Sequence, residues 1–111
     1  MAALTPSTVT TGGLLASASA VSASDTISGD LVPVGGLIYR VINGGGSPDN
    51  VSVSDGGVTP ASNPGTVTPV AVTNGTTKSI LITQANINRS TNQVTITHSF
   101  TTSVTAELVR V

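Results

Sequence analysis

The chain has 111 residues, with four Lys or Arg, five Asp or Glu and a formal net charge of −1. This composition offers no basic surface for phosphate-driven binding of nucleic acid. The absence of cysteine excludes a disulfide framework and a thiolate metal site. No apolar run is long enough to span a bilayer and no basic n-region opens the chain, so we expect neither membrane association nor classical secretion.

The length fits one domain whose core has little aromatic content, because Tyr39 and Phe100 are the only aromatic residues. The core must therefore be built from Val, Ile, Leu and Ala side chains. Such a core predicts modest stability for a lone monomer, and association with a partner would add to it. The uncharged surface, rich in Ser, Thr, Asn and Gly, suits life inside an assembly.

The first 13 residues show no hydrophobic periodicity, which predicts an extended N-terminal arm ahead of a domain at residues 14–111. Two interpretations of the arm stay open: a frayed terminus, or a segment that orders against a neighbour. Alternating Ser and Ala favour a strand at residues 14–21. A turn beside a short strand follows at residues 24–30, and Pro33 restricts residues 31–34 to an edge strand or a strand start.

The centre of the predicted fold is a hairpin. Its first strand, residues 37–42, is almost wholly apolar and β-branched, which suits a strand covered on both faces. Its second strand, residues 51–54, alternates Val and Ser, which suits a half-exposed strand. Three consecutive glycines and a proline in residues 43–50 permit a tight reversal between them.

The second half of the chain predicts a long loop and then short strands. Gly and Pro mark residues 55–66 as the loop, and Pro69 makes residues 66–72 an edge strand. Asn74-Gly75 predicts a turn. Further strands are expected at residues 78–83, 93–98 and 103–111, with a loop holding one helical turn at residues 84–92. About seven short strands result, the pattern of a single small β-sandwich or barrel in the all-β class.

Residues that could carry chemistry are few. His98 is the one candidate base, and we expect it to be a partly buried or rim residue at a strand end rather than a catalytic one. The acidic residues are scattered, without an Asp-x-Asp run. We therefore expect no catalytic residue, no metal and no cofactor, and a protein that is not an enzyme. Arg40 lies in an apolar strand and would need a carboxylate or carbonyl partner if buried.

Several motifs together resemble one family. The chain opens with Ala3-Leu4-Thr5-Pro6, and a strand runs into Val41-Ile42-Asn43-Gly44-Gly45-Gly46. Asn92-Gln93-Val94-Thr95-Ile96-Thr97 is then followed, after a short turn, by Thr102-Ser103-Val104-Thr105-Ala106-Glu107-Leu108. The combination resembles the small head-decoration, or minor capsid, proteins of tailed bacteriophages.

The resemblance implies a structural virion protein, a capsid decoration (cement) protein on the outer surface of the major capsid protein shell, which it stabilises. It also implies a homo-oligomer, with a trimer favoured, and no direct contact with nucleic acid or membrane. Exposed edges and the arm could pair with a neighbour by strand addition. The candidate partner contacts come from the arm, the central hairpin and a later loop: Thr5, Pro6, Thr8, Arg40, Asp49 and Arg89.

Two other functions stay open. The Ser-, Thr- and Asn-rich loops would also suit a β-sandwich adhesion or carbohydrate-binding module. An enzyme would have to rest on His98 alone.

Overall fold

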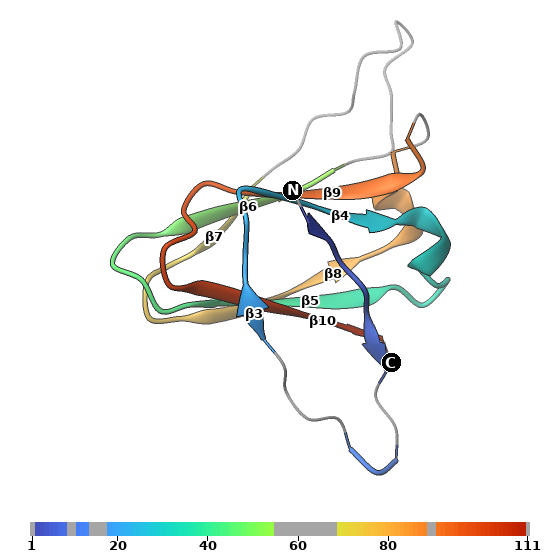
Figure 1. Ribbon diagram of the computed structural model, residues 1–111, viewed down its shortest axis with the longest axis horizontal. Coiled ribbons are helices and arrows are strands. Elements are labelled where there is room, and N and C mark those ends of the chain that lie inside the picture. The colour runs from blue at the N-terminus through green and yellow to red at the C-terminus, as the bar shows by residue number, and fades with distance from the viewer. Residues whose placement is uncertain (1, 9–10, 14–17, 55–68, 89–90, 111) are drawn as a thin grey trace, which may run out of the picture.

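A computed structural model describes residues 2–8, 11–13, 18–54, 69–88 and 91–110. These residues form two packed β-sheets, and no helix among them is longer than a single 3₁₀ turn, which confirms the predicted all-β sandwich (Figure 1). The first sheet has the order β1 (Ala2–Ala3), β4 (Ser24–Ser28), β9 (Gln93–His98), β6 (Asp49–Val53) and β7 (Val70–Val72). The second has the order β2 (Ser7–Thr8), β10 (Val104–Arg110), β5 (Leu37–Asn43) and β8 (Thr77–Ile82), and β3 (Ser19–Ala20) also pairs with β10.

The core lies between the two sheets and is made of aliphatic side chains, as the composition predicts. Alternation sets which side chains enter it, since successive residues of a strand point to opposite faces. In β9, Val94, Ile96 and His98 are buried while Gln93 and Thr97 are exposed. The buried apolar residues are Ile27, Val32, Leu37, Tyr39, Val41, Val51, Val72, Ile82, Val94, Ile96, Val104, Ala106 and Leu108.

The predicted central hairpin is wrong, because its two strands belong to different sheets. β5 pairs with β10 on one edge and β8 on the other, whereas β6 pairs with β7 and β9. With both edges of β5 occupied, no place remains for β6 beside it. The glycine-rich segment at residues 44–48 is therefore a corner that carries the chain from one sheet to the other.

Asn43 and Gly45 fix the path of this corner. The buried Asn43 amide donates to the carbonyl oxygens of Ser47 at 2.8 Å and Val72 at 3.0 Å, and its Oδ1 accepts from the Gly45 N–H at 3.0 Å. A Cβ at position 45 would collide with the Thr102 carbonyl oxygen and the Phe100 ring. The glycine is required by this close approach of two backbones.

Two further expectations need correction. β5 is not covered on both faces: Leu37, Tyr39, Val41 and Asn43 are buried, but the side chains between them are half-buried or exposed. Residues 31–34 do not form a strand. The 3₁₀ turn η1 (Gly29–Leu31) leads instead into a turn in which the Gly36 N–H donates to the Pro33 carbonyl, because Pro33 has no N–H to give to a sheet.

The later elements follow the sequence closely. β7 is an edge strand that begins just after Pro69, and β8, β9 and β10 occupy the predicted positions. The Asn74-Gly75 turn is present, with Gly75 at φ +78°, and η2 (Gln84–Asn86) is the predicted helical turn. The predicted loop at residues 55–66 lies outside the described residues. Of the strand predicted at residues 14–21, the described part contains β3 alone.

Residues 2–8, here called the strap, join the two sheets at one side of the sandwich. β1 runs parallel to β4, and β2 runs parallel to β10. Between them the Leu4 N–H donates to the Thr26 carbonyl oxygen at 2.7 Å, and the Leu4 side chain packs partly buried against the core. In Figure 1 the strap is the dark-blue chain that passes from the first sheet to the second. This part of the predicted arm therefore lies along the sandwich.

Candidate functional site

A chain of three polar side chains crosses the core from β6 through β9 to β5. His98 Nδ1 lies 2.5 Å from Asp49 Oδ2, and His98 Nε2 lies 2.8 Å from the Tyr39 hydroxyl oxygen. The Asp49 and His98 side chains have no exposed surface, and Tyr39 is 1% exposed. We call Asp49, His98 and Tyr39 the core triad.

Asp49 fixes the direction of the hydrogen bonds in the core triad. Its Oδ1 accepts from the backbone N–H groups of Ser99 at 3.0 Å and Phe100 at 3.2 Å. An ionised carboxylate is an acceptor only, so His98 Nδ1 carries the proton that points at Asp49. With a neutral ring, Nε2 is then an acceptor, and the Tyr39 hydroxyl donates to it.

Tyr39 is held in its neutral form. Burial, followed by the nearby carboxylates of Asp25 and Asp49, raises its pKa above the ordinary value, because all three disfavour a phenolate. A hydroxyl that keeps its proton is a poor nucleophile and a poor base. Within the described residues, the two ring nitrogens of His98 are hydrogen-bonded to Asp49 and Tyr39, so the ring does not activate a serine as in a hydrolytic triad.

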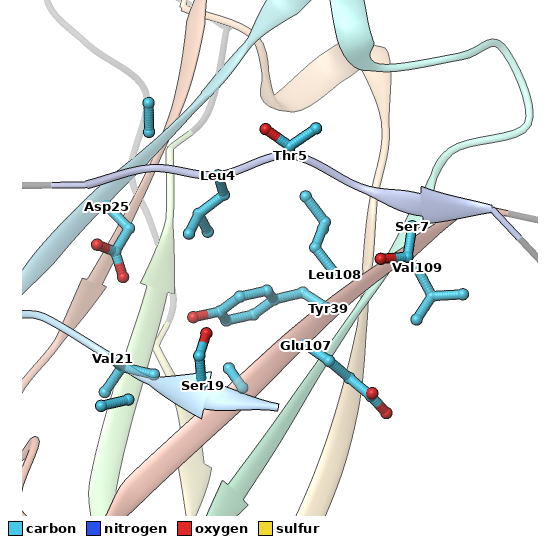
Figure 2. Close-up of a pocket in the computed structure, with 13 residues that line it drawn as sticks. Leu4, Thr5, Ser7, Ser19, Val21, Asp25, Tyr39, Glu107, Leu108 and Val109 are labelled. Carbon is cyan, nitrogen blue, oxygen red and sulfur yellow. The ribbon is translucent and has the colours of Figure 1, made fainter. Parts of the chain in front are cut away.

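A pocket of about 240 Å³ lies beside the Tyr39 end of the core triad. Its rim is formed by the strap and by β3 with Val21, and its floor by Tyr39 and β10. Figure 2 shows the Tyr39 hydroxyl, the Asp25 carboxylate and the Ser19 hydroxyl at one end of it. Asp25 is buried, and the Ser22 hydroxyl and backbone N–H both donate to its carboxylate. This end of the pocket is therefore polar, and the rest of the lining mixes apolar residues such as Leu4 and Leu108 with the polar residues Thr5 and Ser7.

The predicted contact residues lie in three different places. Thr5, Pro6 and Thr8 belong to the strap; Thr5 is exposed at the pocket rim and Thr8 is exposed in β2. Arg40 is exposed on the outer face of β5, where its guanidinium meets Glu107 Oε1 at 3.1 Å. Arg89 lies outside the described residues. The structure thus brings the strap residues together and separates them from Arg40.

The prediction that Asp49 contacts a partner is wrong, because its carboxylate is buried inside the fold. His98 is also more deeply buried than the expected rim position. The pairing of the two was not predicted because 48 residues separate them in the sequence. One signal could have found His98: it shares the even-numbered phase of Val94 and Ile96, which face the core.

In the part of the chain that the structure describes, no helix has the length and apolar character needed to cross a membrane. Among the same residues, no three His, Cys, Asp or Glu side chains gather in a way that could hold a metal ion. The chain matches no protein-family model, no curated protein and no solved structure. A function for the chain must therefore be inferred from its own residues and from the resemblance in its sequence.

Proposed function

We propose that the chain is a structural, non-catalytic virion protein that decorates the outer surface of a major capsid protein shell and stabilises it. The sequence resemblance supports this function. The observation that carries it in the structure is an exposed face of the second sheet. We call this surface, formed by the outward side chains of β8, β5 and β10, the outer face.

The outer face consists of three rows of side chains in register across the sheet. Leu81, Ile38 and Val109 form an apolar row, in which Leu81 is 62% exposed. The neighbouring rows are Ser79–Arg40–Glu107 and Thr77–Ile42–Thr105. Ile38 and Val109 are half-buried beside the exposed Leu81, and a contiguous, partly exposed apolar row on a sheet is typical of surfaces that bind another protein.

The charge of the outer face favours a protein shell over a charged partner. Its two ionised side chains, Arg40 and Glu107, form an ion pair with each other, so the face has no net charge. Docking through such a surface relies on apolar contact and shape.

In addition, β8 ends the second sheet, and no described strand pairs with its other edge. A free edge can add a strand from a neighbour.

The decisive experiment uses assembled particles from the source of this chain. We expect the chain in purified particles at a fixed ratio to the major capsid protein, measured by quantitative mass spectrometry. Absence from purified particles would contradict the proposal. Light scattering of the isolated chain tests the trimer that the resemblance implies.

Rebinding to shells stripped of the chain locates the surface that docks. Leu81→Asp places a charge in the apolar row and should abolish co-sedimentation with the shells. Asn50→Asp adds the same charge at an exposed position of the first sheet and should leave binding unchanged. Equal binding of the two variants would exclude the outer face as the docking surface.

A further inference from the structure

We propose that the strap is exchanged between copies of this chain, so that the strap of one copy lies on the sandwich of its neighbour. The surface that receives it, here called the strap groove, consists of the edge of β4 that β1 covers, the edge of β10 that β2 covers, and the pocket beneath the strap. The partner is a second copy of the chain, and the surface is separate from the outer face.

Few contacts hold the strap on its own sandwich. β1 and β2 contain two residues each, and each of them pairs with a single strand. Between them, Leu4 contributes one further backbone hydrogen bond and a partly buried side chain. A terminal segment with such short ladders opens more readily than the longer strands of a sandwich. We therefore expect the strap to leave the strap groove while the rest of the fold stays intact.

The strap also spans a pocket instead of packing closely on the strands below it. Leu4, Thr5 and Ser7 lie along the rim of this space of about 240 Å³, and Tyr39 lies on its floor (Figure 2). Atoms on opposite sides of such a space do not contact each other, so they contribute little dispersion energy. Release of the strap therefore breaks less packing than release of a core strand would.

The strap groove would be unfavourable if it stayed empty. Without the strap, β4 and β10 would each present unpaired backbone groups along one edge, and the apolar surface under Leu4 would meet water. Edges of this kind attract another strand. An identical strap from a second copy restores each of these contacts, so the exchanged form loses no interaction that the closed chain makes.

The linker that follows the strap is longer than the closed chain requires. Thr8 pairs with Arg110 and Ser19 pairs with Ala106, so the two ends of the linker lie four residues apart along β10. Four strand residues cover about 13 Å. The ten residues between Thr8 and Ser19 can span up to about 33–36 Å when extended. This reach exceeds the 19 Å thickness of the molecule, so it is enough to deliver the strap to an adjoining copy.

The described part of the linker lies away from the sandwich. Thr11, Gly12 and Gly13 are exposed, and Figure 1 shows this segment well below both sheets. Gly13 has φ +88°, a conformation that glycine adopts without strain. Because glycine also adopts extended conformations, a change at this point can redirect the strap toward a neighbour at little steric cost.

Concentration decides between the closed and the exchanged form, because the two contain the same contacts. A short flexible linker keeps the strap near its own groove at an effective concentration in the millimolar range. A second copy competes when the chain reaches such concentrations, or when copies are held side by side in an oligomer. Mutual exchange gives a symmetric dimer, whereas exchange in one direction around a ring gives a closed trimer.

The test uses single-cysteine variants, because the natural chain contains no cysteine. Thr8→Cys and Arg110→Cys change exposed residues that are register partners in β2 and β10. A mixture of the two variants is oxidised, and the heterodimer is identified by its mass. We expect a disulfide-linked heterodimer whose share rises as the chain concentration approaches the millimolar range. Absence of the heterodimer at these concentrations would overturn the proposal.

Two controls separate exchange from random collision. Arg40→Cys mixed with Glu107→Cys places the cysteines at register partners in β5 and β10, which the strap does not include, so this mixture should give only a background of heterodimer. Leu4→Asp, added to the Thr8→Cys chain, should reduce the heterodimer to the same background, because a charge is unfavourable where Leu4 packs. Equal yields in the control mixture, or yields that survive Leu4→Asp, would mean collision and would overturn the proposal.

A chain that carries both Thr8→Cys and Arg110→Cys calibrates the cross-link. In dilute solution it should form the disulfide within one chain; failure to do so would mean that the strap does not lie beside β10, which also contradicts the proposal. None of these mixtures contains a shell, so the result is independent of the capsid proposal. A chain that is present in particles but forms no heterodimer would fail only the present inference, and the reverse result would fail only the capsid proposal.

Discussion

Tyr39 and Arg40 are neighbours in β5, yet they enter two acid–base arrangements with opposite surroundings. Tyr39 points inward to His98, which meets Asp49 at 2.5 Å with no exposed side-chain surface on either residue. Arg40 points outward to Glu107 at 3.1 Å, with 49% and 10% of the two side chains exposed. Two consecutive residues of β5 thus contact two different kinds of pair. We call the buried Asp49–His98 pair the dry pair and the partly exposed Arg40–Glu107 pair the wet pair.

The burial of each contact, and not the pairing itself, sets how much the contact contributes to stability. Water can replace Glu107 as a partner of Arg40, because half of the Arg40 side chain is exposed, so the loss of Glu107 leaves the guanidinium solvated. Asp49 has no such substitute at the buried His98 ring, and its second oxygen also accepts from the backbone N–H groups of Ser99 and Phe100 just after β9. Breaking a dry pair leaves buried donors without acceptors.

The largest effect is therefore expected for Asp49→Ala. The substitution removes the acceptor of the buried His98 ring and of two backbone N–H groups, and we expect the free energy of unfolding to fall by about 3–5 kcal/mol. Urea denaturation measures the change. Asp30→Ala is the matched control at an exposed acidic residue and should stay within about 0.5 kcal/mol of wild type. Equal effects of the two substitutions would contradict a structural role for the core triad.

Gly45→Ala tests the corner that closes over the core triad. The new methyl group would strike the Thr102 carbonyl and the ring of Phe100, whose own N–H donates to Asp49. We expect a loss of about 1–3 kcal/mol from this overpacking, measured by thermal and urea unfolding. Gly46→Ala is the control, since a Cβ there meets nothing within 4 Å. A corner that tolerates both substitutions equally is not held by this contact.

Tyr39→Phe removes the hydroxyl at the end of the core triad and leaves the His98 Nε2 atom without its donor. We expect a loss of about 1–3 kcal/mol at neutral pH, because a buried acceptor is left unsatisfied. The measurement is urea unfolding of Tyr39→Phe beside the wild type. A loss below that range would mean that water or another donor reaches Nε2.

The same residue predicts a pH dependence. An unfolded Tyr ionises near about pH 10, whereas burial raises the pKa of Tyr39 in the folded chain. The contribution to stability is therefore complete below about pH 10 and is lost as the pH rises toward the folded pKa. Tyr39→Phe should lack this part of the alkaline loss. Tyr39 is the single Tyr in the chain, so its absorbance titration reports the folded pKa directly; an unshifted titration would contradict the prediction.

Local patterns predicted which residues form strands better than which strands pair. The alternation in residues 93–98 was enough to predict β9, and Pro69 was enough to place β7 at an edge. Pairing could not be predicted in this way, because β5 and β6 are adjacent in sequence but belong to different sheets. The core triad depends on that crossover: it requires β5, β6 and β9 to converge from both sheets, which no sequence spacing encodes.

The smallest effect is expected for the wet pair. In a double-mutant cycle with Arg40→Ala and Glu107→Ala, the coupling energy should be at most about 1 kcal/mol, because Arg40 keeps half of its side chain in water. The coupling should shrink further as salt is added, since an exposed pair is screened. The matching cycle with Asp49→Ala and His98→Ala should show a larger coupling that salt barely changes. If the two cycles gave equal couplings with equal salt dependence, burial would not be what separates the two sides of β5.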